Sequence, residues 1–171
     1  MVKIDFDKYI ALLSWRSIYW GIEKNILSPK NAILYAGKII ELNPEIDIPE
    51  IISLLISEST EKDVILSLIE DIISNTPELE NDEESNMRLI RYIVLSELKE
   101  KIQAPDSLLS EIENIYADFD YPTDMESFIA YMPASDSYNT SEHSEEENIQ
   151  HLIKNFNSFM TNEKQQLKIS F

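Results

Sequence analysis

The sequence predicts an all-α protein, and three observations support that fold class. Only 2 of the 171 residues are Gly, and the 7 Pro residues fall at the edges of apolar segments. Between these edges, apolar residues recur at spacings of three and four, which places them on one face of a helix. Helix start signals precede the same segments. We therefore expect a single compact domain over residues 1–171, with roughly eight or nine helices joined by short loops.

The N-terminal part is predicted to be helical and rich in aromatic residues. Trp15, Tyr19 and Ile22 follow helical spacing, so we expect them in the core, with Gly21 allowing a neighbouring helix to approach closely. The dipeptide Ser28–Pro29 then supplies a capping hydroxyl and a proline suited to the first helical position. The next helix carries this apolar stripe: Ala32, Ile33, Ala36, Ile39 and Ile40.

Later helices are predicted in the same way. Pro49 and Pro105 lie near helix starts, while Thr60 and Asp63 open the central helix. The stripes of these helices are Val64, Ile65, Leu68, Ile69, Ile72 and Ile73; then Ile90, Ile93, Val94, Leu98 and Ile102; then Leu108, Ile112, Ile115, Tyr116 and Phe119.

Two capping boxes are predicted near the C-terminus. Thr123 with Glu126 would begin a short helix that runs through Tyr131, and Ser144 with Glu147 would begin the last long helix. The last helix carries this stripe: Ile149, Leu152, Ile153, Phe156 and Met160.

The overall charge restricts the classes of partner. The net charge is −18, from 32 acidic and 14 basic side chains. Binding of nucleic acid or of an anionic membrane depends on Lys and Arg, so neither is an expected partner. The chain has no Cys, its N-terminus does not look like a signal peptide, and no apolar run reaches the roughly 18–20 residues of a membrane span. We expect a cytoplasmic protein whose natural partner is basic.

The negative charge is concentrated in one part of the chain. Residues 102–153 hold 12 acidic side chains and no Lys or Arg, whereas residues 1–101 hold 19 acidic and 11 basic ones. Helix surfaces usually mix both signs, because opposite charges four residues apart stabilise a helix. Two interpretations stay open: an acidic face that only improves solubility, or a surface that binds a strongly basic partner.

Within this part, the stretch from Asn114 to Pro133 alternates aromatic and acidic residues. Its carboxylates would attract a basic partner, and exposed aromatic side chains often dominate the affinity of interfaces. The predicted partner-binding residues, including the acidic residues that follow this stretch, are Asp118, Asp120, Tyr121, Asp124, Glu126, Tyr131, Glu142, Glu145 and Glu146.

Enzyme chemistry finds little support in the motifs. Asp118, Asp120 and Asp124 with His143 or His151 could bind a divalent metal, but the spacing is neither that of an EF-hand loop nor that of a zinc motif. No G-x-S-x-G elbow and no glycine-rich phosphate loop is present. We therefore predict no catalytic residue, no metal and no cofactor.

Three segments resemble a known bacterial family. The segment from Ser14 to Ala36, S-W-R-S-I-Y-W-G-I-E-K-N-I-L-S-P-K-N-A-I-L-Y-A, the block from Glu113 to Pro133 and H-S-E-E-E-N-I at His143 to Ile149 are similar to domain-of-unknown-function family 2247. The resemblance implies a small, all-helical cytoplasmic protein of the kind seen among immunity proteins of polymorphic toxin systems. It assigns no catalytic residue.

The hypothesis that follows is an immunity protein, which neutralises a basic toxin domain such as a nuclease by occluding its cationic cleft. One alternative is a helical scaffold or regulator in a larger complex, which would show an exposed apolar groove. The other is a metal-dependent enzyme.

Overall fold

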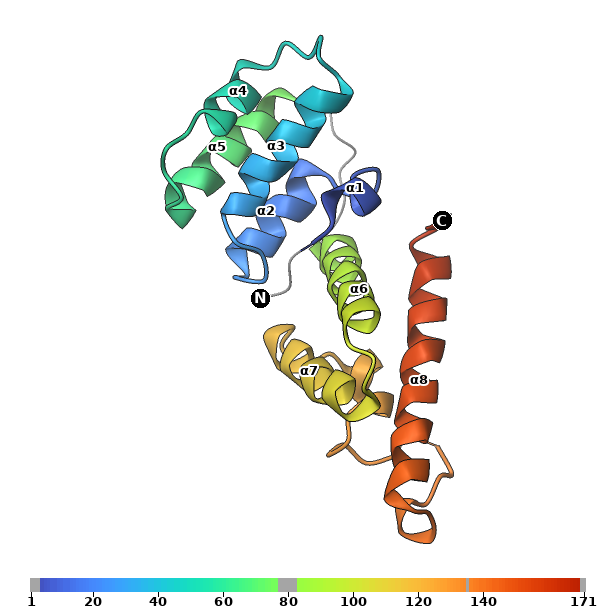
Figure 1. The fold of residues 1–171 in the computed structure, drawn as a ribbon. Coiled ribbons are helices and arrows are strands. Elements are labelled where there is room, and N and C mark those ends of the chain that lie inside the picture. Colours follow the sequence, from blue (N-terminus) through green and yellow to red (C-terminus); the bar gives the residue numbers. More distant parts are fainter. Residues whose placement is uncertain (1–3, 77–82, 135, 170–171) are drawn as a thin grey trace. The chain divides into compact units, whose positions relative to one another are not determined.

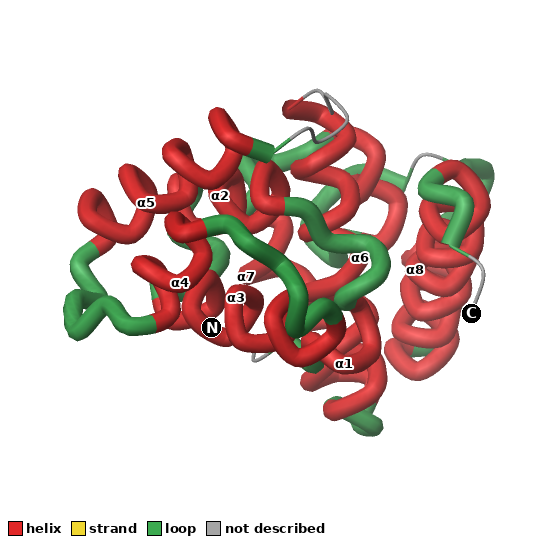
Figure 2. The backbone as a smooth tube through the Cα atoms, turned by 90° about the horizontal axis from the view of Figure 1, so that it is seen from above, coloured by secondary structure: helices red, strands yellow, loops and turns green. Residues whose placement is uncertain are grey.

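The computed structural model describes residues 4–76, 83–134 and 136–169. Within these ranges the chain forms α-helices and two short 3₁₀ helices, and no described residue lies in a β-strand (Figures 1 and 2). The all-α prediction is confirmed. The elements are α1 Phe6–Tyr9, α2 Trp15–Glu23, α3 Lys30–Leu42, α4 Pro49–Leu55, α5 Lys62–Asn75, α6 Glu83–Lys101, α7 Pro105–Asp118, the 3₁₀ helices η1 Thr123–Phe128 and η2 Thr140–Glu142, and α8 Glu145–Gln166.

The residues group into two compact units. The N-terminal unit ends at Ile90, and the C-terminal unit begins at Arg91, so the boundary falls inside α6. Each unit has its own buried apolar side chains. That one domain spans residues 1–171 stays a prediction.

In the N-terminal unit, α2 and α4 both pack against α5, and α3 packs against α4. Ile65, Ile69 and Ile72 are completely buried on α5, as the apolar stripe predicts. Val64 is 41% exposed, so its place in that stripe was predicted wrongly. The reason is geometric, because residues at spacings of four and three already fill the packed face, and Val64 lies to one side of it.

The aromatic residues of α2 are mostly core residues. Trp15 and Trp20 are buried, and the Trp15 ring meets the Tyr35 ring edge to face at 4.7 Å between centroids. The Tyr35 hydroxyl donates to the carbonyl of Leu13 at 2.8 Å. Tyr19, which was predicted in the core, is only half-buried and donates its hydroxyl to Glu70 at 2.7 Å. Its polar end therefore stays at the surface.

A tight turn ends α2. Asn25 has a φ of 61°, the left-handed conformation that Asn tolerates well after a helix. The N–H groups of Ile26 and Leu27 both donate to the carbonyl of Gly21, at 2.9 and 2.8 Å. This brings the buried Leu27 side chain so close that a Cβ at Gly21 would lie 2.7 Å from it. Gly21 does allow a close approach, but the prediction of a neighbouring helix is wrong, because the partner is Leu27 in the turn after α2.

In the C-terminal unit, α8 packs against α7 and against η1. Phe128 is completely buried and contacts Phe156 and Phe159, with ring centroids 5.5 and 5.1 Å away. The predicted helix through Tyr131 is instead the 3₁₀ helix η1, without a side-chain cap. Extended backbone at Ile129 ends η1, which lets Phe128 and Ile129 both reach the core although they are neighbours in sequence.

The end of α7 carries unusual backbone. Asp120 and Tyr121 have φ values of 60° and 56°, so two successive residues other than Gly adopt the left-handed conformation. For Tyr121 this conformation costs about 1–2 kcal/mol, whereas Asp tolerates it better because its short polar side chain can hydrogen-bond locally. The Tyr121 N–H donates to the carbonyl of Tyr116 at 2.9 Å, which closes the turn. This turn fixes where the Tyr121 ring lies.

Candidate functional site

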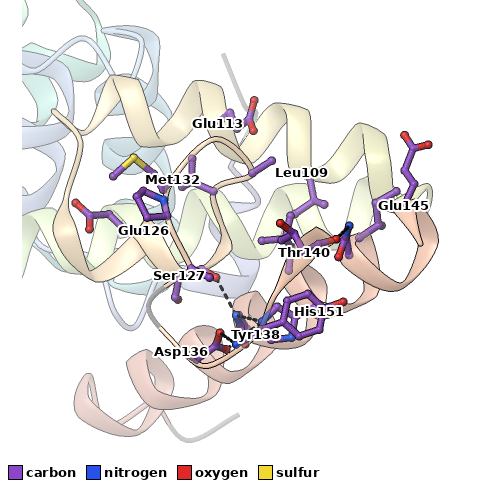
Figure 3. A pocket seen from close by; sticks show the side chains of 18 of the residues that line it. Leu109, Glu113, Glu126, Ser127, Met132, Asp136, Tyr138, Thr140, Glu145 and His151 are labelled. Carbon is purple, nitrogen blue, oxygen red and sulfur yellow. Dashed lines mark hydrogen bonds and ion pairs between the residues drawn. The ribbon is translucent and has the colours of Figure 1, made fainter. Parts of the chain in front are cut away.

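A pocket of about 480 Å³ lies in the C-terminal unit (Figure 3). Its walls come from α7, from η1 with the loop that follows it, and from the first half of α8. Ligand pockets usually measure roughly 300–1,000 Å³. The pocket is therefore large enough for a few side chains of a partner, although not for a folded domain.

Negative charge dominates the pocket lining. Among the described residues that line it are five carboxylate side chains and no Lys or Arg: Asp106, Glu113, Glu126, Asp136 and Glu145. Figure 3 shows the carboxylates of Glu113, Glu126 and Glu145 spread around the pocket. Spread carboxylates suit several cationic groups of one segment better than a single ion that needs its ligands at one point.

Helical spacing places the α7 wall. Asp106, Leu109, Ser110 and Glu113 recur at intervals of three, four and seven, so they share one face of α7. Leu108, Ile112 and Ile115 are buried on the neighbouring face, which packs into the core. The same amphipathic pattern therefore builds the core and turns carboxylates toward the pocket.

A capping box begins the α8 wall, as predicted. The Ser144 hydroxyl accepts from the Glu147 N–H at 3.3 Å, and the Glu147 carboxylate accepts from the Ser144 N–H at 2.8 Å. The bond from the Ser144 N–H, followed by the bond from its hydroxyl at 2.9 Å, lowers the pKa of Glu147 below its usual value. The first turn of α8, with Glu145 at the pocket, is fixed by these bonds.

Replacing Ser144 with Ala is expected to destabilise the protein by about 0.5–2 kcal/mol at neutral pH, because an N-cap is lost.

Glu147→Gln should be destabilising in a pH-dependent way. Since the folded pKa of Glu147 is lowered, its stabilisation is complete above the unfolded value of about 4.3 and is lost as the pH falls through the folded value. Thermal unfolding of wild type and variant between pH 7 and 3 measures the difference.

Glu146→Gln is the matched control, because Glu146 is an exposed acid on the same turn. We expect it to leave the pH dependence unchanged. A Glu147→Gln effect of equal size at pH 7 and pH 3 would contradict the assignment of the lowered pKa.

Three stacked rings tie the loop before α8 to the helix. The Tyr138 ring lies between those of His143 and His151, with centroids 4.4 and 3.7 Å away and planes only 8° and 4° from parallel. His151 Nε2 also lies 3.0 Å from a carboxylate oxygen of Asp136. Burial, then the charges of Glu147 and Asp136, raise the pKa of Tyr138. Its ring therefore stays neutral in the stack.

Asn155 links two walls of the pocket. Its side-chain amide donates to the carbonyl of Ser127 at 2.8 Å and lies 3.2 Å from His151 Nε2. Figure 3 shows Ser127, Asp136, Tyr138 and His151 close together at one end of the pocket. The loop, η1 and α8 are thereby held in one arrangement.

The predicted partner-binding residues separate into groups. Only Glu126 and Glu145 line the pocket. Tyr121 and Tyr131 are exposed, and both of their rings contact the ring of Tyr116. Glu142 accepts from the Asn139 side chain at 2.7 Å. The remaining exposed acids at the end of α7 and the start of α8 are Asp118, Asp120 and Glu146.

Asp124 has a structural contact that the sequence did not suggest. The guanidinium of Arg91 donates to both of its carboxylate oxygens, at 2.9 Å for the Nη1–Oδ1 pair. The Arg91 side chain is 1% exposed, and it also lies 3.7 Å from the buried Glu163 and over the Phe159 ring. The Asp124 charge is therefore compensated inside the protein, so it contributes less to an external negative field than was expected.

Sequence reasoning missed several pocket residues. Asp106 and Glu113 could have been found, because they share the helical face described above. Asp136 could not have been found, and His151 was considered only as a metal ligand, because their contact joins a loop to a helix 15 positions later. No group of three His, Asp or Glu side chains placed to hold a metal ion occurs among the described residues. None of the helices in the described ranges combines the length and apolarity needed to cross a membrane.

Fold and site together define a helical protein with an acidic pocket in its C-terminal unit. The family described as an uncharacterized protein conserved in bacteria, domain-of-unknown-function family 2247, matches residues 4–164. The chain belongs to this family, which confirms the resemblance of the three segments. Neither curated proteins nor solved structures gave a match.

Proposed function

We propose that this protein binds a basic partner protein through the acidic pocket, and that it acts as an immunity protein which neutralises a basic toxin domain by occlusion. The lining of five carboxylates without Lys or Arg supports this proposal most directly. A concave surface of one sign concentrates the field, speeds the encounter with a partner of opposite sign and disfavours anionic ligands.

The shape of the site defines how the partner would bind. A pocket of about 480 Å³ accepts a short segment carrying Lys or Arg, not the whole cleft of a toxin. Nucleases hold phosphate with such cationic side chains. When these side chains are inserted among carboxylates, they are no longer available to substrate, which is inhibition by occlusion.

The proposal is tested by removing charge from the pocket. The tagged protein is used to isolate its partner from the native bacterium, and association is then followed with purified components at several salt concentrations. Glu113→Gln, Glu126→Gln and Glu145→Gln together should slow association roughly ten-fold or more at low salt. The partner alone should inhibit growth, and coexpression of the wild-type protein should restore it.

A matched triple variant controls for net charge. Glu45→Gln, Glu58→Gln and Asp71→Asn also remove three negative charges, but from exposed positions of the N-terminal unit. This variant should associate almost as fast as wild type. Equal slowing by both triple variants would overturn the pocket as the binding site. A partner that is harmless when expressed alone would overturn the immunity function.

Exposed apolar side chains support the scaffold alternative. On and beside α3, α4 and α5, six large apolar side chains are 38–72% exposed: Leu34, Leu42, Ile52, Leu55, Ile56 and Val64. A scaffold would bind through such side chains. If Ile52→Ser with Ile56→Ser abolishes partner capture while the pocket triple variant does not, the scaffold function is the better account.

A further inference from the structure

Three tyrosines form a cluster beside the pocket. Tyr116 lies on α7, Tyr121 lies in the turn that ends this helix, and Tyr131 lies in the loop after η1. The Tyr116 ring meets the Tyr121 ring edge to face at 5.3 Å and the tilted Tyr131 ring at 6.4 Å between centroids. Tyr116 is buried, whereas Tyr121 and Tyr131 are 57% and 60% exposed. The rings of Tyr121 and Tyr131 are therefore exposed to solvent, and both contact the buried ring of Tyr116.

A strained backbone conformation holds the exposed Tyr121 ring in this arrangement. Tyr121, directly after Asp120, adopts the left-handed conformation, which bulky residues rarely do. A strained conformation of this kind suggests a function when it fixes an exposed side chain. Here the left-handed backbone places the Tyr121 ring against the Tyr116 ring. Burial of the Tyr121 ring does not explain this conformation, since more than half of the Tyr121 side chain is exposed.

Carboxylates of the pocket lie close to the cluster. Glu113 lies three residues before Tyr116 on α7, so the two side chains are neighbours on the helix. Burial and then the charge of Glu126 raise the pKa of Tyr116, and burial and then the charge of Glu113 raise the pKa of Tyr131. Both glutamates line the pocket, as do the chain neighbours of Tyr131, Ala130 and Met132. Tyr131 therefore lies at the edge of the pocket, and the cluster adjoins the pocket there.

This surface suits a cation. The negative face of a tyrosine ring attracts ammonium and guanidinium groups, and nearby carboxylates strengthen that attraction. Within the described part of the chain, Lys or Arg side chains lie over the rings of Tyr9, Phe156 and Phe159, but over neither Tyr121 nor Tyr131. No Lys or Arg occurs between positions 102 and 153 to occupy the cluster locally.

We propose that Tyr116, Tyr121 and Tyr131, flanked by Glu113 and Glu126, form a subsite for one Lys or Arg side chain of the basic partner protein. Tyr121 and Tyr131 contact the cation through their ring faces, and Tyr116 positions them. Further basic side chains of the same segment enter the adjoining pocket. This subsite rests on the proposed function, because it names the anchor point of the same partner.

The test uses a six-residue arginine peptide as the probe and its six-residue citrulline analogue as the control. Citrulline keeps the shape of arginine but carries no charge, so the ratio of the two dissociation constants isolates the contribution of the cation. Titration calorimetry at low salt measures both peptides with the full-length protein. Wild type should bind the arginine peptide at least ten-fold more tightly than the citrulline peptide.

The variants separate rings from carboxylates. Tyr121→Leu and Tyr131→Leu remove exposed rings, and each should weaken arginine-peptide binding about five-fold or more. Tyr121→Phe and Tyr131→Phe keep the ring faces and should stay within about two-fold of wild type. The double variant Glu113→Gln with Glu126→Gln should also weaken binding and should reduce the dependence of binding on salt. The leucine variants should leave that salt dependence unchanged.

Each outcome has a distinct meaning. If both leucine variants bind the arginine peptide like wild type while the glutamine variant binds it weakly, the tyrosine subsite is wrong and the acidic pocket remains. If wild type does not distinguish the arginine peptide from the citrulline peptide, the proposed function fails as well. Weak binding by the phenylalanine variants would show that the hydroxyls, not the ring faces, make the contact, which also overturns the subsite.

Discussion

Arg91→Ala is expected to destabilise the protein by about 3–5 kcal/mol, because it removes a buried guanidinium and leaves its carboxylate partner behind. The guanidinium is almost completely buried, donates to both oxygens of Asp124 and lies near the buried Glu163. Its removal leaves negative charge uncompensated and takes away the packing of the side chain against Phe159. Urea unfolding followed by circular dichroism measures the loss.

Two further variants show whether the ion pair itself is responsible. Asp124→Asn should cost less than Arg91→Ala, because the Asp124 side chain is 48% exposed and water compensates part of the change. The two changes should be clearly non-additive, as expected for groups in direct contact. Asp118→Asn is the control, since Asp118 is an exposed acid of the same region. A cost below about 1 kcal/mol for Arg91→Ala would contradict the structural role of the pair.

The two glycines of the chain are expected to respond in opposite directions to replacement by Ala. A Cβ at Gly21 would lie 2.7 Å from Cγ and Cδ1 of the buried Leu27, so the turn after α2 must shift. Overpacking usually costs about 1–3 kcal/mol. Since Ala favours a helix over Gly by up to about 1 kcal/mol, we expect a net loss of about 1–2 kcal/mol for Gly21→Ala.

Gly37→Ala should instead stabilise the protein by about 0.5–1 kcal/mol. Gly37 lies inside α3, and a Cβ at this position would make an ordinary contact of 3.8 Å with Leu55. Equilibrium unfolding of both variants provides a comparison in which the chemical change is the same. Stabilisation by Gly21→Ala would show that Leu27 moves away without cost.

The helices could be predicted from the sequence because their causes are local. Apolar spacing in α7 placed Ile112, Ile115 and Tyr116 in the core, and all three are buried. The capping box of Ser144 and Glu147 depends on residues three apart and forms as expected. Each of these features needs only one helix and its first turn, so the amino-acid pattern contains the required information.

The site depends on contacts that local patterns do not encode. Asp124 looked like a free carboxylate, because residues 102–153 hold no cation, yet Arg91 contacts it from 33 positions earlier. The stack of His143, Tyr138 and His151 likewise requires a loop to fold back on α8. The acidic character of residues 102–153 could be predicted from the sequence. The pocket that several of their carboxylates line could not.

Both tryptophans of the chain, Trp15 and Trp20, belong to the N-terminal unit, and the C-terminal unit has none. Indole fluorescence therefore reports the unfolding of one unit alone, whereas helical circular dichroism reports both. Overlaying the two unfolding curves shows whether the chain melts in one cooperative step or in two. The position of two side chains thus turns an ordinary pair of spectroscopic measurements into a direct test of how many folding domains the protein has.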